Sequence, residues 1–279
     1  MMKFLKKAYV YLIFIFLYAP IGILIIYSFN DSRSRGAWGG FTLRWYSELF
    51  KDRQIMNALY YTLAIAVIAS IVATIVGIAA AIGIFSMKKF KRELMLNINH
   101  LPILNPDIVT GIALMLLFAS VKLPLGFLSM LLAHITFCIP YVILSIMPKL
   151  KQMNKHLYEA ALDLGATPFY AFKRVIMPEI MPGVITGFLL ALTLSLDDFV
   201  ISFFTTGNGV TNLSITVESM ARRGISPKLN ALSTLMFLAV LLLLIVVNIR
   251  TSKDANERRE KNEKIRQSGV FVSGSRDNI

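Results

Sequence analysis

The sequence predicts an all-α membrane protein with six transmembrane helices, and its composition and hydrophobic pattern carry that prediction. Hydrophobic residues make up 56% of the 279 residues and charged residues 16%, whereas a soluble domain has about a quarter charged residues. The apolar residues form long continuous runs, not the alternating or amphipathic patterns of a soluble core. Six runs reach the roughly 20 residues that a helix needs to cross a bilayer, and they are too continuous for the strands of a membrane β-barrel.

The six runs divide the chain into a membrane domain and a tail. We expect spans at about residues 8–29, 57–85, 100–120, 127–147, 183–206 and 229–249. No small-residue cleavage pattern follows the first span, so it is expected to stay in the protein instead of being removed as a signal peptide. Spans two and five are rich in small residues, which favours close helix packing in the protein's own bundle or at a subunit interface. Residues 1–249 are thus expected to form a six-span domain, with a loop at 148–182 and a polar tail at 250–279.

The basic residues predict the orientation of these spans. Of the 29 Lys and Arg residues, 20 lie in the N-terminus, after span two, in the loop after span four and in the tail, and nine lie on the opposite side. Basic residues favour the cytoplasmic side of a membrane, so both termini are expected in the cytoplasm. The net charge of +13 is thereby explained by topology and by contact with anionic lipid, and nucleic acid is not an expected partner.

A mixed-charge loop of about 35 residues joins spans four and five, and it is much longer than a helix–helix connection needs. Asn154 is suited to cap a first helix over NKHLYEAALDLG, which Gly165 ends. A second short helix over ATPFYAFKRVIMP is expected to have Thr167 as its N-cap and Pro168 in its first position. Two short helices joined at a glycine predict a docking surface for another protein.

Aspartates inside the predicted spans are costly in lipid, so each indicates a function or a partner. Asp197 and Asp198 lie well inside span five, and neighbours on one helix point about 100° apart, so they cannot pair with each other. Either polar or basic groups on other helices neutralise both carboxylates, or at least one carboxylate faces a water-filled pathway and attracts a cation. Asp107 follows Asn105, a suitable N-cap, and Pro106, a suitable first helical residue, so capping and a pathway role both fit it.

The remaining chemistry-bearing residues give weaker signals. Trp45 lies in RWYSELF, which is expected to form a short helix on the outer membrane surface, with substrate contact as the alternative. His134 stands alone in span four and is expected to pack, because no two histidines have metal-ligand spacing. The only cysteine, Cys138, excludes a disulfide framework. A membrane enzyme that uses Asp197 and Asp198 as an acid/base pair is an alternative, but it leaves the long loop unexplained.

The loop resembles the membrane subunits of ATP-binding-cassette importers, whose pattern is E-A-A-x3-G-x9-I-x-L-P. Val and Met replace the Ile and Leu of that pattern, and the matching residues are Glu159, Ala160, Ala161, Gly165 and Pro178. The resemblance implies the type I importer permease fold and a pair of coupling helices that seat in a groove of a separate ATPase subunit. It also implies that ATP and Mg²⁺ bind to that ATPase, and that this chain has no cofactor and no catalytic site of its own.

Most of the chain is also similar to the second permease subunit of the spermidine/putrescine importers. The similarity is densest from Asp197 to Leu235 and includes SLDDFVISFFTTG and SMARRGISPKLNALSTL, and it extends to NPDIVTGIAL. It implies polyamine transport across a bacterial inner membrane, with a second homologous permease and an extracytoplasmic polyamine-binding protein as partners. The residues that it implies along or near the substrate path are Asp107, Asp197, Asp198, Trp45 and Glu218. The same machine with ferric iron, thiamine or an organic cation as its substrate is the alternative.

Overall fold

A computed structural model describes residues 2–32, 37–224, 227–242 and 245. Within this part of the chain the structure is helical, and the one extended pairing is an isolated antiparallel bridge between Asn30 and Phe41. The chain divides into two compact units, Met1–Leu49 with Ile225–Ile279, and Phe50–Gly224. The predicted all-α fold class is confirmed.

The first unit contains the N-terminal helix α1 (Met2–Ser28), which includes the apolar stretch Tyr9–Ser28. The expected short helix in the following loop is present as α2 (Arg44–Lys51). The last predicted span is described as a helix over Pro227–Leu242, which is shorter than a full membrane crossing. Most of the remainder of that span, and the tail at 250–279, lie outside the described residues.

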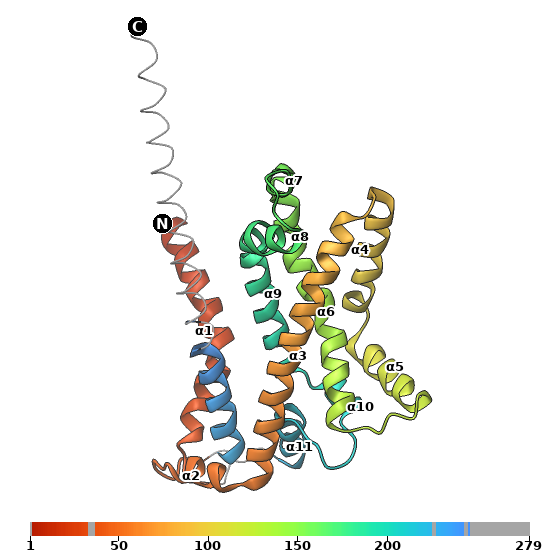
Figure 1. Ribbon diagram of the computed structural model, residues 1–279. Coiled ribbons are helices and arrows are strands. Elements are labelled where there is room, and N and C mark those ends of the chain that lie inside the picture. Colours follow the sequence, from red (N-terminus) through yellow and green to blue (C-terminus); the bar gives the residue numbers. More distant parts are fainter. Residues whose placement is uncertain (1, 33–36, 225–226, 243–244, 246–279) are drawn as a thin grey trace. The chain divides into compact units, whose positions relative to one another are not determined.

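Three helices form the centre of the second unit, namely α3 (Arg53–Ser86), α6 (Phe127–Gln152) and α9 (Met177–Asp197). They pack against one another along their lengths (Figure 1). A Cβ atom on Gly77 of α3 would lie 2.5 Å from Cγ1 of Val142, and one on Gly183 of α9 would lie 2.8 Å from the Ser145 carbonyl. The small residues of α3 and α9 therefore allow these helices to pack closely against α6 within this chain.

The third predicted span is a bent pair of helices, α4 (Lys89–Leu104) and α5 (Asp107–Ser120), which meet at 101°. The expected N-cap at Asn105 is wrong, because Asn105 closes α4 and its N–H donates to the Leu101 carbonyl. Pro106 stands in the cap position of α5, no side chain caps that helix, and Asp107 is its first residue.

The loop after α6 contains α7 (Lys155–Asp163) and α8 (Pro168–Ala171), followed by a π-helical turn, η1 (Phe172–Ile176). The expected second short helix begins at Pro168 with Thr167 as its N-cap, but it continues into the next apolar helix instead of ending before it. The continuous helix expected over 183–206 is interrupted at Asp198. Pro168–Asp197 is one helical element of 30 residues, and the chain then breaks at Asp198 before the short helix α10 (Val200–Thr205).

The π turn explains why the helix continues past Pro178. In a regular α-helix, a proline ring clashes with the carbonyl four residues earlier. In this chain the N–H of Met177 donates to the Phe172 carbonyl, five residues earlier. A turn of this kind is wider than an α-helical turn, and it alters the backbone directly before the proline.

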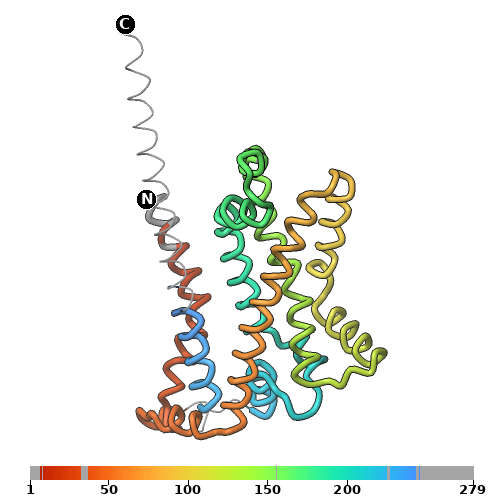
Figure 2. Tube along the Cα trace, in the orientation of Figure 1, coloured from red at the N-terminus to blue at the C-terminus, as the bar shows by residue number. Residues whose placement is uncertain are grey.

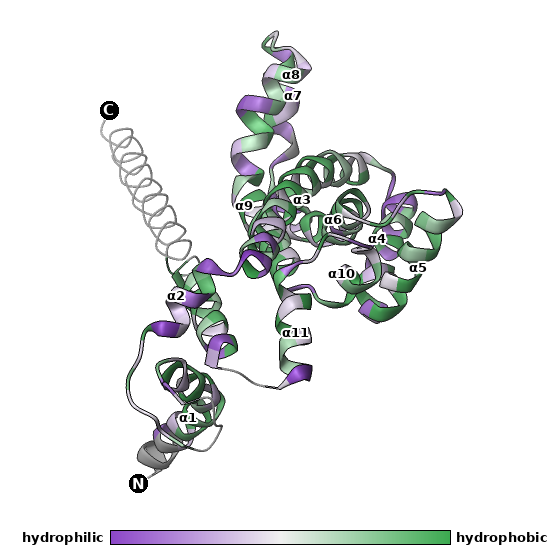
Figure 3. Cartoon of the chain, turned by 90° about the horizontal axis from the view of Figure 1, so that it is seen from below, coloured by the Kyte–Doolittle hydropathy of each residue, from purple (hydrophilic) through white to green (hydrophobic). Residues whose placement is uncertain are grey.

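The two ends of the second unit differ. The α7–α8 segment lies at the same end as the turn between α3 and α4, and α10 and α11 (Leu213–Arg223) lie at the other (Figures 1 and 2). The two segments of this unit that the basic residues assign to the cytoplasm thus share one end. Hydrophilic residues concentrate on α7, whereas α3 and α6 are largely hydrophobic (Figure 3).

Candidate coupling surface and buried polar network

The turn at Gly165 has the geometry of a helix end that needs glycine. The N–H of Ala166 donates to the Ala161 carbonyl and the N–H of Gly165 donates to the Leu162 carbonyl, at 3.0 and 2.9 Å. This is the Schellman pattern, in which the residue after the helix adopts a left-handed conformation. Gly165 has a φ of +83°, and nothing lies within 4 Å of a Cβ placed on it. The backbone angle, not the available space, therefore favours glycine here.

The predicted caps of the loop are confirmed. The side chain of Asn154 accepts a hydrogen bond from the N–H of His156, and that of Thr167 accepts one from the N–H of Tyr170. Glu159 is exposed on α7, 3.4 Å from Nδ1 of His156. Each of these bonds joins residues close in the sequence, so the two helix starts are specified locally.

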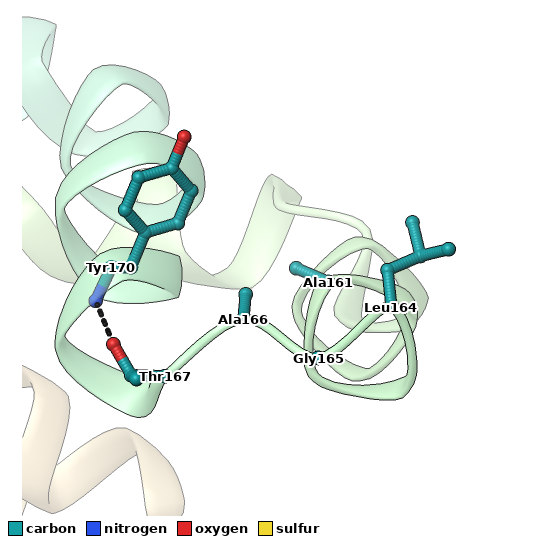
Figure 4. A pocket seen from close by; sticks show the side chains of 6 residues that line it. All are labelled: Ala161, Leu164, Gly165, Ala166, Thr167 and Tyr170. Carbon is teal, nitrogen blue, oxygen red and sulfur yellow. Dashed lines mark hydrogen bonds between the residues drawn. The ribbon is translucent and has the colours of Figure 1, made fainter.

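Large apolar side chains of this loop are exposed. Leu164 is 89% exposed, Phe169 73% and Tyr170 57%. An open hollow of about 510 Å³ lies at the glycine turn, with Ala161 on α7 and Tyr170 on α8 on either side of it (Figure 4). Exposed apolar groups beside a preformed hollow are typical of a surface that another protein covers.

At the other end of α9, Asp198 lies at the break between two helices. Its backbone is extended, and its carboxylate accepts hydrogen bonds from the N–H groups of Ile201 and Ser202, at 3.2 and 2.7 Å. The side chain is only 7% exposed. Asp198 therefore caps α10, and the expectation that both aspartates lie on one continuous helix is wrong.

His134 of α6 connects the two sides of this break. Nδ1 of its ring lies 2.6 Å from Oγ of Ser195 in α9, and Nε2 lies 2.9 Å from Oγ of Ser202 in α10. Nε2 also lies 3.5 Å from Oδ2 of Asp198. The ring is 1% exposed, so what was expected to be a packing residue is the centre of a buried polar network.

Asn212 extends this network to two further helices. Its side-chain amide donates to Oγ of Ser202 and to the carbonyl of Asp198, at 2.7 and 3.1 Å, and its Oδ1 caps α11 by accepting from the N–H of Ile215. The next residue, Leu213, donates its N–H to Oγ1 of Thr62 in α3. We call His134, Ser195, Asp198, Ser202 and Asn212 the break network.

The spacing of polar residues in the sequence does carry a signal for this network. Residues 195, 198 and 202 are polar and are spaced by three and four, which places them on one helical face. A polar face of this kind within an apolar run indicates a buried partner on another helix. His134 is the partner that the structure supplies.

The other residues implied along the path lie in different settings. Asp197 is the last residue of α9 and is exposed, and Asp107 is exposed at the start of α5. Glu218 of α11 accepts a hydrogen bond from Nε of Arg222 at 2.9 Å. Trp45 is buried in the first unit, where its indole N–H donates to the Asn30 carbonyl at 2.8 Å.

Comparison with known proteins assigns the chain to a family. Residues 73–252 match the model of the binding-protein-dependent transport system inner membrane component. The chain is 42% identical over 237 residues to the putrescine transport system permease protein PotI of Escherichia coli (strain K12), covering 81% of this chain and 83% of PotI. It is 36% identical over 251 residues to the spermidine/putrescine transport system permease protein PotC of Haemophilus influenzae, covering 90% of this chain and 98% of PotC.

Solved transporters share the fold at low sequence identity. A chain of a bacterial ABC transporter involved in alginate import superimposes with a TM-score of 0.72 at 13% identity, covering 88% of this chain and 95% of the other. A chain of the MetNI methionine ABC transporter gives a TM-score of 0.57 at 15% identity, covering 75% and 99%. With the match over residues 73–252, these findings show that this multi-pass chain belongs to the family of inner-membrane components of binding-protein-dependent transport systems.

Proposed function

We propose that this chain is a permease subunit of an ATP-binding-cassette importer that moves polyamines such as spermidine and putrescine. One observation supports a mechanism in which movement of the loop is transmitted to the substrate path. The exposed loop and the exposed carboxylate of Asp197 belong to the two ends of one helical element, Pro168–Asp197. A helix of 30 residues is about 45 Å long. A force applied at the loop is therefore carried by a rigid element to the opposite end.

The drive comes from a separate ATPase subunit that docks on residues 154–178. The residues that match the family pattern hold or display this surface, with Glu159 exposed on α7 and Gly165 in the turn. Pro178 directly follows the π turn, where the loop joins α9. ATP and Mg²⁺ bind to that partner, and this chain carries out no covalent chemistry.

The full membrane unit has six spans in this chain, with both termini in the cytoplasm, paired with a second homologous permease. An extracytoplasmic binding protein delivers the substrate. The shared end of α7, α8 and the basic turn Lys88–Arg92 supports this orientation, because basic residues collect on the cytoplasmic side. Alternating access between the two sides then moves the substrate inward.

Exposed carboxylates suit a polyamine, which is a flexible polycation. Asp197 stands at the C-terminal end of α9, where the helix dipole disfavours a negative charge and favours a bound cation. Asp107, in the first turn of α5, is the second exposed carboxylate on the proposed path. Asp198 contributes through the break that it caps, and Glu218 on α11 is assigned to the outer entrance.

Competition for uptake tests this proposal. Cells that lack their own polyamine importers are given this chain with its partner subunits, and uptake of radiolabelled putrescine is measured against excess spermidine, ferric citrate, thiamine and choline. We expect spermidine and unlabelled putrescine to compete and the others to have no effect. Uptake of thiamine, ferric iron or choline in place of putrescine would overturn the polyamine assignment and leave the coupling mechanism intact.

A further inference from the structure

The break between α9 and α10 exposes backbone groups that something must satisfy. The last carbonyls of one helix and the first N–H groups of the next lose their intrahelical partners, and water is not available for them in the core of a bilayer. The side chain of Asp198 accepts from two N–H groups of α10. Asn212 donates to the Asp198 carbonyl and Ser214 to the Leu196 carbonyl, at 3.1 and 3.5 Å. Side chains of other segments therefore maintain this break.

One ring determines the separation of the two helix ends. The two ring nitrogens of His134 bond to Ser195 in the last turn of α9 and to Ser202 in α10, at 2.6 and 2.9 Å. An imidazole is rigid, so the two serines cannot move apart or together while both bonds hold. Because α6 supplies the ring, the end of α9 is also fixed relative to the central helix of the bundle.

The position of Asp197 depends on this attachment. Asp197 lies two residues after Ser195 and directly before Asp198. Asp197 is exposed, whereas the side chains of Ser195 and Asp198 are buried. Neighbouring residues of a helix point about 100° apart, so Asp197 and Asp198 face different surroundings at the end of α9. At the break the Asp198 carboxylate bonds to the N–H groups of Ile201 and Ser202 and is buried, whereas Asp197 stays exposed.

We propose that His134 is a positioning residue for transport, which holds the end of α9 so that the Asp197 carboxylate stays exposed to a cationic substrate. This inference rests on the proposed function, because it takes Asp197 to be part of the polyamine path. His134 itself is buried and acts through Ser195 and Ser202, not by touching the substrate.

Chemical labelling tests the positioning without relying on transport. Asp197→Cys is introduced into the assembled transporter, and its modification by a cationic methanethiosulfonate reagent is followed by mass spectrometry of this chain. The native Cys138 is buried, so it gives a low background. We expect His134→Ala to slow modification at position 197 by about tenfold, the scale of losing buried hydrogen bonds. His134→Gln, whose amide both donates and accepts, should restore most of the rate.

A matched control lies one half-turn away on α6. Thr136 is exposed and its hydroxyl bonds only to the Leu132 carbonyl of its own helix, so Thr136→Val should leave the labelling rate unchanged. If His134→Ala fails to insert, Ser195→Ala removes one of the two bonds and serves in its place. An unchanged labelling rate in every inserted network variant would overturn the proposal.

Uptake provides the second measurement. In the native background, His134→Ala should raise the half-saturating putrescine concentration by about tenfold, with a smaller change in the maximum rate per inserted molecule. A fall in the maximum rate alone would show a structural role and overturn the positioning role. If the native transporter takes up no polyamine at all, the proposed function fails, whereas the labelling result still decides whether His134 positions residue 197.

Discussion

The two ends of the helical element Pro168–Asp197 are stabilised in opposite ways. At the loop end, hydrogen bonds join residues a few positions apart, as in the caps at Asn154 and Thr167, and large apolar side chains are exposed. At the break network, buried side chains bond across 61 and 68 positions in the sequence, from His134 to Ser195 and Ser202.

Under the proposed function, this difference separates two tasks. A surface that must meet a partner can fold from local bonds and leave its apolar groups uncovered until the partner arrives. A polar site at membrane depth must satisfy every group internally, because neither water nor lipid does so. Substitutions at the loop should therefore affect coupling, and those in the network should affect folding or substrate affinity.

The largest contrast is expected between the two adjacent aspartates. Asp198→Ala leaves the cap of α10 empty and the N–H groups of Ile201 and Ser202 without their partner, and an unsatisfied buried group costs about 1–3 kcal/mol. Asp197→Ala, at an exposed position, should change the free energy of unfolding by less than about 0.5 kcal/mol and should abolish polyamine uptake. Thermal unfolding of the purified complex in detergent measures the first effect. Equal unfolding temperatures for the two variants would remove the distinction between them.

Two asparagine caps give the next comparison. Asn212 caps α11 within the buried network, whereas Asn154 caps α7 in the exposed loop. Asn212→Ala leaves buried groups unsatisfied and should cost about 1–3 kcal/mol plus the lost cap. Asn154→Ala should cost about 1 kcal/mol, confined to the loop. Hydrogen exchange of the backbone amides should show wide opening in the first variant and opening of α7 alone in the second.

A substitution at Gly165 should separate coupling from stability. At a φ of +83°, a β-branched side chain costs at least about 1–2 kcal/mol in backbone strain. We expect Gly165→Val to change the turn, to abolish uptake and to leave insertion intact. Gly165→Asn should keep most of the activity, because Asn tolerates the left-handed conformation best among the larger residues. Normal uptake by the Val variant would show that the turn does not couple.

The smallest effect on stability is expected at Leu164. Its side chain is 89% exposed, so Leu164→Ser should change the free energy of unfolding by less than about 0.5 kcal/mol. If a partner covers this surface, the same variant should weaken binding of the ATPase, measured by how much ATPase co-purifies with the complex. Ser219 is half-buried on α11 at the opposite end of the unit, and its hydroxyl donates to the Thr216 carbonyl of its own helix. Ser219→Ala should therefore leave co-purification unchanged.

Much of the fold could be predicted from local patterns. The apolar runs predict where α3 and α6 lie, because about 20 apolar residues are enough to specify a helix in lipid whatever its neighbours. Asn154, Gly165 and Thr167 predict the ends of the loop helices, because capping bonds join residues that are close in sequence. The family pattern from Glu159 to Pro178, on which the proposed ATPase coupling rests, can also be read from the sequence because its residues lie close together in the chain.

Only the tertiary structure decided what happens at the ends of α9. The wide turn before Pro178 joins the loop to the span, and the break at Asp198 ends the span nine residues before its predicted end at 206. Hydropathy does not register the break, since the residues on both sides of Asp197 and Asp198 are apolar, and it gives no signal for a widened helical turn. His134 lies 64 residues before Asp198 in the chain, and only packing of α6 against α9 and α10 brings the two together. The sequence by itself determined the membrane helices and the exposed loop, and long-range packing decided which aspartate is buried and which one faces outward.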